Sequence, residues 1–239
     1  MLKNFNTSPN DRFRSELLQR YWQYQENRFP LAHEYFDQHN QDFQRPPVFL
    51  PEKAHLNILI SPDSPPQENE RLFELIPKGE HHRWYSSMNS SQALALSVLG
   101  NLFVSNQLSV LSLLQGDDGE PLIFNESIQY EKLCLEHKID YLGERRKTSI
   151  DAFIPGEFQI AIECKFTEKE VGSCSRPRIK KSNPKYKQLY CDGSYKEKEG
   201  HQGRCVLAES GAEYWKLIPY FLNWDIHQDE EQCKLRYTY

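Results

Sequence analysis

Long apolar runs are missing from the sequence, and so is a secretory leader. The most apolar stretch, residues 93–114, is interrupted by Ser, Gly, Asn and Gln, whereas a membrane-spanning helix needs about 20 consecutive apolar residues. The opening residues, MLKNFNTSPNDRFR, contain no apolar segment of the kind that defines a signal peptide. We therefore expect a cytoplasmic protein with no membrane partner.

An excess of positive charge is also missing, since the chain has 29 Lys and Arg residues, 34 Asp and Glu residues and a formal net charge of -5. A protein that coats nucleic acid without specificity is usually basic, so this balance argues against that class. It leaves room for a local basic groove. One basic run, residues 173–187, contains no acidic residue. Its basic residues are Arg176, Arg178, Lys180, Lys181, Lys185 and Lys187.

No two cysteines have the Cys-x-x-Cys spacing, although the chain contains six cysteines. Cys174, Cys191 and Cys205, together with His201, are the candidates for a zinc site, but their spacing fits no standard zinc motif. We therefore expect free thiols in a reducing compartment. The Gly-x-Ser-x-Gly elbow, the P-loop and the dinucleotide-binding glycine fingerprint are missing too, so nothing points to those enzyme classes.

The first 80 residues are predicted to form a helical and proline-rich extension. Helical periodicity predicts a helix that starts near residues 8–11, followed by a second helical segment at residues 31–43. The apolar residues that carry the first periodicity are Leu17, Leu18, Tyr21, Trp22 and Tyr24. Residues 46–78 are rich in proline and are expected to be loop, with one short strand at residues 56–60.

Residues 81–239 are predicted to form the core domain. A turn at Asp117-Asp118-Gly119 follows its first helix. The expected helices are residues 90–114, 184–199 and 213–222, and the expected strands are residues 130–141, 149–154, 158–166 and 204–209. Short links between the first three strands predict an antiparallel meander. The order indicates an α/β or α+β fold, with a mixed sheet flanked by helices.

Three charged residues stand on the second and third of these strands, within SIDAFIPGEFQIAIECKF. Strand alternation places Glu163 and Lys165 on one face, roughly 6–7 Å apart along the strand. The turn at residues 155–157 brings Asp151 back beside that pair. Charges on an otherwise apolar strand pair are costly unless they serve each other or a metal.

This arrangement suits the hydrolysis of a phosphodiester. Two converging carboxylates bind Mg²⁺, or Mn²⁺ in its place, through hard oxygens, and the metal polarises a phosphoryl oxygen and lowers the pKa of bound water. A neighbouring lysine orients that water or offsets the growing negative charge. Asp151 and Glu163 are thus candidate metal ligands, and Lys165 is the candidate catalytic lysine.

The spacing of these residues is weak evidence by itself, because a second set satisfies it. Asp118 precedes Glu136-His137-Lys138 at a comparable distance. The decoy aspartate falls in a turn, however, and its strand alternates polar and apolar residues as a half-exposed strand does. The alternative for Glu163 and Lys165 is a surface ion pair on a solvated sheet face.

At these residues the chain resembles the PD-(D/E)XK restriction-endonuclease-like nucleases, and in particular a group of bacterial restriction endonucleases. The similar segments are TSIDAFI, IAIECKFTE and the upstream SSQALALSVLGNL. The resemblance covers residues 86–222, and Ile150-Asp151 stands where the superfamily often has Pro-Asp. It implies a mixed sheet flanked by helices, dependence on Mg²⁺ and cleavage of DNA. Some members bind an iron–sulfur cluster through four cysteines, which the scattered cysteines of this chain do not lead us to expect.

Further candidates have weaker support. Many members of the superfamily carry an extra glutamate upstream of the aspartate, for which Glu136 is the first choice and Glu131 the second. Alternation predicts that Glu136 lies opposite the face of Leu133, Leu135 and His137. Gln92, on the long helix, could reach the site or could simply be a polar residue of the helix start. Glu168 and Glu170 are expected on an exposed loop.

The basic run follows the catalytic strand directly. Arg176, Arg178, Lys180 and Lys181 are therefore candidate contacts to DNA phosphates, and Tyr186 and Tyr190 could stack on bases. The alternative is a solvated loop, because charge runs usually are solvated.

Two functions remain open at this point. The first is a Mg²⁺-dependent DNA endonuclease of a restriction or defence type. The second is a catalytically silent subunit that uses a nuclease fold to bind DNA or a partner. A homodimer is an open alternative to a monomer, since double-strand cutters of this kind often pair two active sites.

Overall fold

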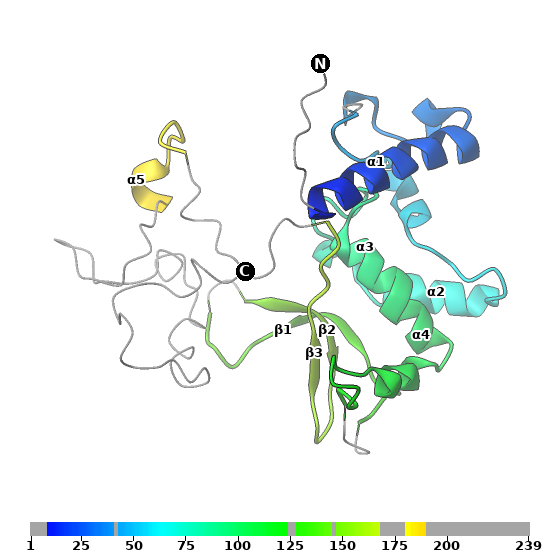
Figure 1. The fold of residues 1–239 in the computed structure, drawn as a ribbon, viewed down its shortest axis with the longest axis vertical. Helices are drawn as coiled ribbons and strands as arrows, with labels where there is room; N and C mark the ends of the chain where they lie inside the picture. Colours follow the sequence, from blue (N-terminus) through cyan, green and yellow to red (C-terminus); the bar gives the residue numbers. More distant parts are fainter. Residues whose placement is uncertain (1–8, 41–42, 124–127, 145–146, 168–179, 190–239) are drawn as a thin grey trace. The chain divides into compact units, whose positions relative to one another are not determined.

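The computed structural model describes residues 9–40, 43–123, 128–144, 147–167 and 180–189 (Figure 1). The chain divides into two compact units, Met1–His137 with Ile150–Thr167, and Lys138–Ser149 with Glu168–Tyr239. The predicted strand at residues 204–209 and helix at residues 213–222 lie outside the described residues. The predicted domain boundary near residue 80 stays a prediction. No described helix is both long and apolar enough to cross a bilayer.

Helix α1, Pro9–Arg28, confirms the predicted first helix. Its inward stripe contains Leu17, Leu18, Tyr21 and Trp22, and the next turn adds Gln25, which is buried, whereas Tyr24 is exposed. The stripe follows the helical period, so position 25 and not position 24 continues it. The described part of residues 31–43 forms the short 3₁₀ turns η1 (Ala32–Glu34) and η2 (Gln38–Asn40), because the chain becomes extended at Phe36 and bridges Phe49.

The proline-rich stretch contains a helix that its composition did not predict. Helix α2, Pro66–Glu74, starts on a proline at its first position, where the missing N–H was not needed for an intrahelical bond. It is preceded by a 3₁₀ helix, η3 (Pro51–Asn57), and followed by η4 (Lys78–Glu80).

The prediction of a strand at residues 56–60 is wrong. Its first half belongs to η3. The Leu59 N–H donates to Ser97 Oγ at 3.0 Å, and Asn101 Nδ2 donates to the Leu59 carbonyl at 2.7 Å. Side chains of a neighbouring helix thus satisfy the backbone that a strand partner would otherwise satisfy.

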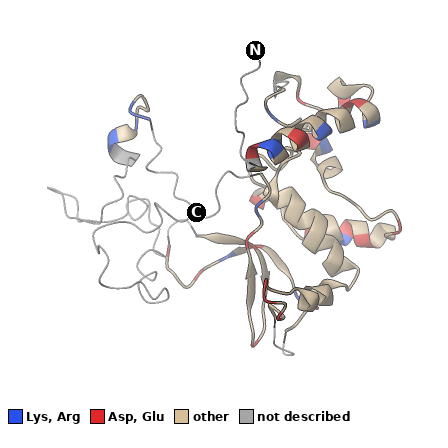
Figure 2. Cartoon of the chain, in the orientation of Figure 1, with Lys and Arg blue, Asp and Glu red and all other residues tan. Residues whose placement is uncertain are grey.

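The long apolar helix consists of α3 (Ser91–Ala95), a π-helical turn η5 (Leu96–Gly100) and α4 (Asn101–Val104). Ser90 caps its start, because its Oγ accepts the Ala93 N–H at 3.2 Å. No Lys, Arg, Asp or Glu lies along these three segments (Figure 2).

This helix ends ten residues earlier than predicted, at Val104 and not at residue 114. Asn106 has a φ of 57°, and the Gln107 N–H donates to the Leu102 carbonyl while the Asn106 N–H donates to Phe103. That is the Schellman arrangement which terminates helices. Residues after it form the 3₁₀ helix η6 (Leu108–Leu113).

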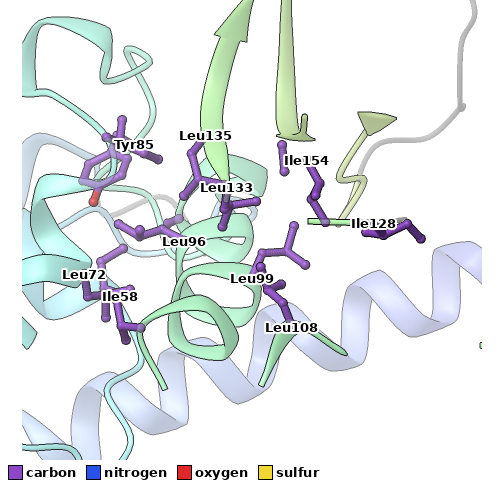
Figure 3. Close-up of a cluster of buried hydrophobic side chains, with 14 residues drawn as sticks. Ile58, Leu72, Tyr85, Leu96, Leu99, Leu108, Ile128, Leu133, Leu135 and Ile154 are labelled. Atoms are coloured by element: carbon purple, nitrogen blue, oxygen red, sulfur yellow. The ribbon is translucent and has the colours of Figure 1, made fainter. Parts of the chain in front are cut away.

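The core lies where α2, the long helix and the sheet meet (Figure 3). Leu72 of α2, Leu96 of η5 and Ile154 are fully buried in it. Gly100 permits the close packing of α2, because a Cβ there would lie 2.6 Å from Leu72 Cδ1. This core fixes the face of the sheet that is turned away from solvent.

The described sheet has three strands in the order β1-β2-β3: β1 (Cys134–Lys138), β2 (Ser149–Ile154) and β3 (Ile160–Ile162). Strands β2 and β3 are antiparallel, with Ala152 paired to Ile162 and Ile154 to Ile160. The order confirms the predicted meander, and helices with this sheet confirm the mixed α and β class. The second unit contributes a short helix, α5 (Tyr186–Leu189).

Candidate active site

Strands β2 and β3 place the three charged residues at the end of their pairing. Ala152 and Ile154 of β2 are fully buried, so Asp151, between Ala152 and Ile150, points to the other face, where it is half-buried. The pairing of Ala152 with Ile162, continued by one residue, sets Glu163 opposite Asp151.

Asp151 holds the chain that leaves β3. Its Oδ2 accepts the backbone N–H of Cys164 at 2.6 Å. The Asp151 side chain thereby accepts the N–H of Cys164, which would bond to the backbone of β2 if the two strands continued to pair. The predicted strand at residues 158–166 is observed over Ile160–Ile162, and the bond to Asp151 lies beyond its second end.

Glu163 and Lys165 lie on the same face, as alternation predicts. Ile160, Ile162 and Cys164 pack against the core, whereas Glu163 and Lys165 are exposed. Lys165 Nζ donates to Glu163 Oε1 at 2.5 Å. The two charges therefore point outward side by side from the segment that Asp151 holds.

Electrostatic coupling links this pair to Asp151. Burial raises the pKa of Asp151, the hydrogen bond from Cys164 lowers it, the carboxylates of Glu163 and Glu136 raise it, and Lys165 lowers it. Burial, with Asp151 and Glu163, also raises the pKa of the Cys164 thiol to about 11. Three carboxylates and one ammonium thus act on one another here, and Cys164 stays a protonated thiol at neutral pH.

Glu136 reaches this cluster through an irregularity in β1. Its φ is 52°, a left-handed conformation that is uncommon outside glycine and that breaks the alternation of a strand. The prediction that His137 shares a face with Leu133 and Leu135 is wrong: His137 stacks on Phe153 at 4.3 Å, on the face that Asp151 also occupies. The side chains of residues 136 and 137 therefore both belong to the face of the sheet that carries the candidate site.

The structure does not bring Gln92 to Asp151. Gln92 is buried; its Oε1 accepts the His82 N–H at 2.8 Å and its Nε2 donates to the Glu80 carbonyl at 3.0 Å. Glu131 is exposed. Asp118 lies in the predicted turn, where its Oδ1 accepts the Glu120 N–H. Of the upstream carboxylates considered, Glu136 is thus the one whose charge acts on Asp151.

The predicted DNA contacts are only partly described. Lys180 and Lys181 are exposed residues of the second unit. Other predicted residues lie outside the described part of the chain: Arg176, Arg178, Glu168, Glu170, Tyr190, Cys174, Cys191, His201 and Cys205.

Two residues that the sequence did not single out bond Thr167, at the end of the segment that carries Glu163 and Lys165. Arg14 of α1 donates through Nε to the Thr167 carbonyl at 2.7 Å, and its Nη2 contacts the same oxygen. Asn89 Nδ2 donates to Thr167 Oγ1 at 3.0 Å. Arg14 lies one turn before Leu17 and Leu18 on the inward stripe of α1, and a charge on such a stripe was the available signal.

The donor set fits a cation held by few protein ligands. Among the described residues, no group of three or more His, Cys, Asp or Glu side chains is arranged to hold a metal. Mg²⁺, however, usually keeps several waters and takes one or two carboxylates. Burial is the main cause of the raised pKa of Asp151, and the charges of Glu163 and Glu136 raise it further; a bound cation would offset the part that comes from these carboxylates.

Comparison with known families found one match. The family described as Restriction Endonuclease associating with ARP matches residues 16–216, most of the 239-residue chain. The matched residues include Asp151, Glu163 and Lys165, as well as most of α1. Comparison with curated proteins and with solved structures found no match. The match supports the predicted resemblance to restriction endonucleases at the level of the family.

Proposed function

Since the chain belongs to the family Restriction Endonuclease associating with ARP, we propose that it is a Mg²⁺-dependent DNA endonuclease of the PD-(D/E)XK type, with a restriction-endonuclease-like fold. The observation that carries this proposal is the meeting of Asp151, Glu163 and Lys165 where β2 and β3 stop pairing. A structural ion pair needs no third charged group and no neighbouring carboxylate.

Asp151 and Glu163 are the proposed metal ligands. The Cys164 N–H fixes the Asp151 carboxylate through Oδ2, so the orientation of this side chain does not depend on a ligand. Glu136 adds a third carboxylate whose charge acts on the same group. When bound, the metal supplies Lewis-acid polarisation of the phosphate and activation of water.

Lys165 is the proposed catalytic lysine. Its ammonium lies beside Glu163 on the exposed face, where the backbone of a DNA strand has access. A positive charge preorganised at this point offsets the negative charge that develops on the phosphate in the transition state. Arg176, Arg178, Lys180 and Lys181 are proposed to bind the flanking phosphates, and a homodimer is proposed for cuts in both strands.

The test is the cleavage of supercoiled plasmid by the purified full chain with Mg²⁺ or Mn²⁺. Lys165→Ala should lower the cleavage rate by roughly 100-fold or more, as the loss of one preorganised charge does, and Asp151→Asn should abolish cleavage. Lys78→Ala is the matched control, because Lys78 is an exposed lysine of the same unit that lies on η4 and not on the strands of the site. Cleavage that survives both Lys165→Ala and Asp151→Asn would overturn the proposal.

A second function is favoured by one observation from the family. The family description names an association with ARP. A silent subunit would bind DNA or a partner without turnover. If the purified wild-type chain binds DNA but does not cleave it with Mg²⁺, Mn²⁺ or Co²⁺, the result would favour this function over the nuclease.

A further inference from the structure

Helix α1 reaches across the chain to the segment that carries the candidate catalytic residues. After β3 the chain runs to the beginning of α1 (Figure 1). Residues 163–167 follow the last backbone pair of β3. Side chains therefore determine where Glu163 and Lys165 are held.

Contacts from α1 and from Asn89 fasten the end of this segment. Arg14 donates to the Thr167 carbonyl through its Nε and Nη2 atoms. The ring of Tyr21, two helical turns further on, meets the ring of Phe166 edge to face at 6.4 Å. A further contact is the Asn89 amide on the Thr167 hydroxyl. Backbone and side chain of Thr167 are thus held from two different elements.

A pocket of about 350 Å³ lies beside these contacts, and Leu17 and Tyr21 of α1, Leu94 of α3 and Phe166 are among the residues that line it. The pocket is partly open to solvent. The ring contact of Tyr21 with Phe166 borders it, whereas Arg14 bonds the backbone of Thr167. Arg14 is therefore the residue of α1 whose removal tests the hydrogen-bonded link between helix and segment.

We propose that Arg14 is a positioning residue of the active site, which acts through Thr167 to hold Lys165 and Glu163 at the end of β3. This inference rests on the proposed nuclease function. Only Phe166 lies between Lys165 and Thr167, so a shift of Thr167 is transmitted to the ammonium over a short piece of backbone. A displacement of about 1 Å at a catalytic group is enough to cost roughly 100-fold in rate. The N-terminal helix is then a working part of the catalytic unit.

The chain offers a matched control on the same helix. Arg12 is exposed and pairs with Glu16 one turn away, so Arg12→Ala removes the same side chain without touching the segment. Arg14→Ala should lower kcat for plasmid cleavage at least 10-fold, with the Kd for DNA measured in Ca²⁺ unchanged. Arg14→Lys should restore part of the rate, because a lysine can still donate one hydrogen bond to the Thr167 carbonyl. Arg12→Ala should leave kcat and Kd unchanged.

A readout that needs no catalysis accompanies the assay. Hydrogen exchange of the Cys164 amide reports the bond to Asp151 Oδ2. Exchange should become faster in Arg14→Ala and stay unchanged in Arg12→Ala, with both variants folded by circular dichroism. Thr167→Val, which keeps the carbonyl but removes the hydroxyl that Asn89 contacts, is the second variant if Arg14→Ala does not fold. It should lower kcat below that of the wild type, with the Kd for DNA in Ca²⁺ unchanged.

The possible results separate the two proposals. If the wild type cuts DNA, Lys165→Ala does not, and Arg14→Ala matches Arg12→Ala in kcat and in Cys164 exchange, the positioning role is overturned while the nuclease stands. If the wild type does not cut, faster exchange of the Cys164 amide in Arg14→Ala still supports the structural link, and the nuclease is what fails. Loss of kcat in strict proportion to loss of folded protein also overturns the positioning role.

Discussion

The carboxylate of Asp151, on β2, and the backbone N–H of Cys164, two residues after β3, form a hydrogen bond of 2.6 Å. The bond does two things at once. It ends the β2–β3 ladder, and it fixes a half-buried carboxylate whose pKa is raised by burial and by Glu163 and Glu136. The residue proposed to bind metal is therefore also the residue that shapes the backbone of the site.

The raised pKa of Asp151 predicts that the metal-free protein becomes more stable on Asp151→Asn. Below the ordinary pKa of 3.8 the carboxyl is protonated in both the folded and unfolded states, so the variant has no advantage there. Between that value and the raised pKa of the folded state, the unfolded state has lost its proton while the folded state still holds it, so the wild type loses stability with rising pH and Asn does not. The advantage should grow with pH and then level off, as measured by urea midpoints in EDTA at a series of pH values.

Asp151→Ala is the control for the hydrogen bond in this series. Asn keeps an oxygen that can accept the Cys164 N–H, whereas Ala leaves that donor without its partner, which costs about 1–3 kcal/mol where the group is buried. Asn should therefore be more stable than Ala at every pH. A stability difference between wild type and Asp151→Asn that did not change with pH would contradict the electrostatic interpretation.

Divalent cations should stabilise the folded protein through the same carboxylates. A ligand that binds only the folded state adds about 2.7 kcal/mol when its concentration is 100 times its Kd. Mg²⁺ or Mn²⁺ should raise the Tm of the wild type, and EDTA should reverse this. In Asp151→Asn the increase should be small, and in Lys78→Ala it should equal that of the wild type. Equal increases in all three proteins would place the cation elsewhere.

We predict that Glu136 is unfavourable for the stability of the fold but needed for DNA cleavage. A non-glycine residue in the left-handed region costs about 1–2 kcal/mol, and Glu136 has a φ of 52°. Glu136→Gly should therefore keep or raise the urea midpoint while it lowers DNA cleavage, because the third carboxylate is lost. Glu131→Gly is the matched control, since Glu131 is exposed and its φ is not positive. That variant should lose some stability and keep its activity.

We predict that substitutions at Gly100 and Leu72 in the core have non-additive effects on stability. Gly100→Ala would place its methyl 2.6 Å from Leu72 Cδ1, and overpacking typically costs about 1–3 kcal/mol, which exceeds the roughly 1 kcal/mol that helix propensity returns. Leu72→Ala alone should cost about 2–5 kcal/mol. In the double variant the methyl introduced at position 100 enters the space that Leu72 leaves. The loss of stability in chemical denaturation should therefore be smaller than the sum of the two single losses.

The sequence predicted those parts of the site in which local pattern decides the structure. Alternation was enough to place Glu163 and Lys165 on one face and Cys164 on the core side, because the apolar residues between them must be buried. The turn between β2 and β3 was enough to set Asp151 near that pair. Their functional roles stay predictions.

The sequence did not predict the features that depend on contacts between distant residues. Nor did it predict those in which side chains bond backbone groups in place of a neighbouring strand. Proline indicated a loop at Pro66, where it starts α2. The pattern of residues 56–60 predicted a strand, but Ser97 and Asn101 bond the backbone of Leu59. A strand pattern could not show the left-handed Glu136 that turns His137 toward Phe153. The role of Arg14 depends on a residue 153 positions away.

That last separation has a consequence for the order of folding. Chains are synthesised from the N-terminus, so α1 exists long before the residue to which Arg14 donates has been made. Closing a loop of 153 residues carries an entropic cost that must be met before the contact can contribute. The proposed catalytic segment can be locked only after most of the molecule has been made and has collapsed, so a nascent or truncated chain would carry the residues of the site without its geometry.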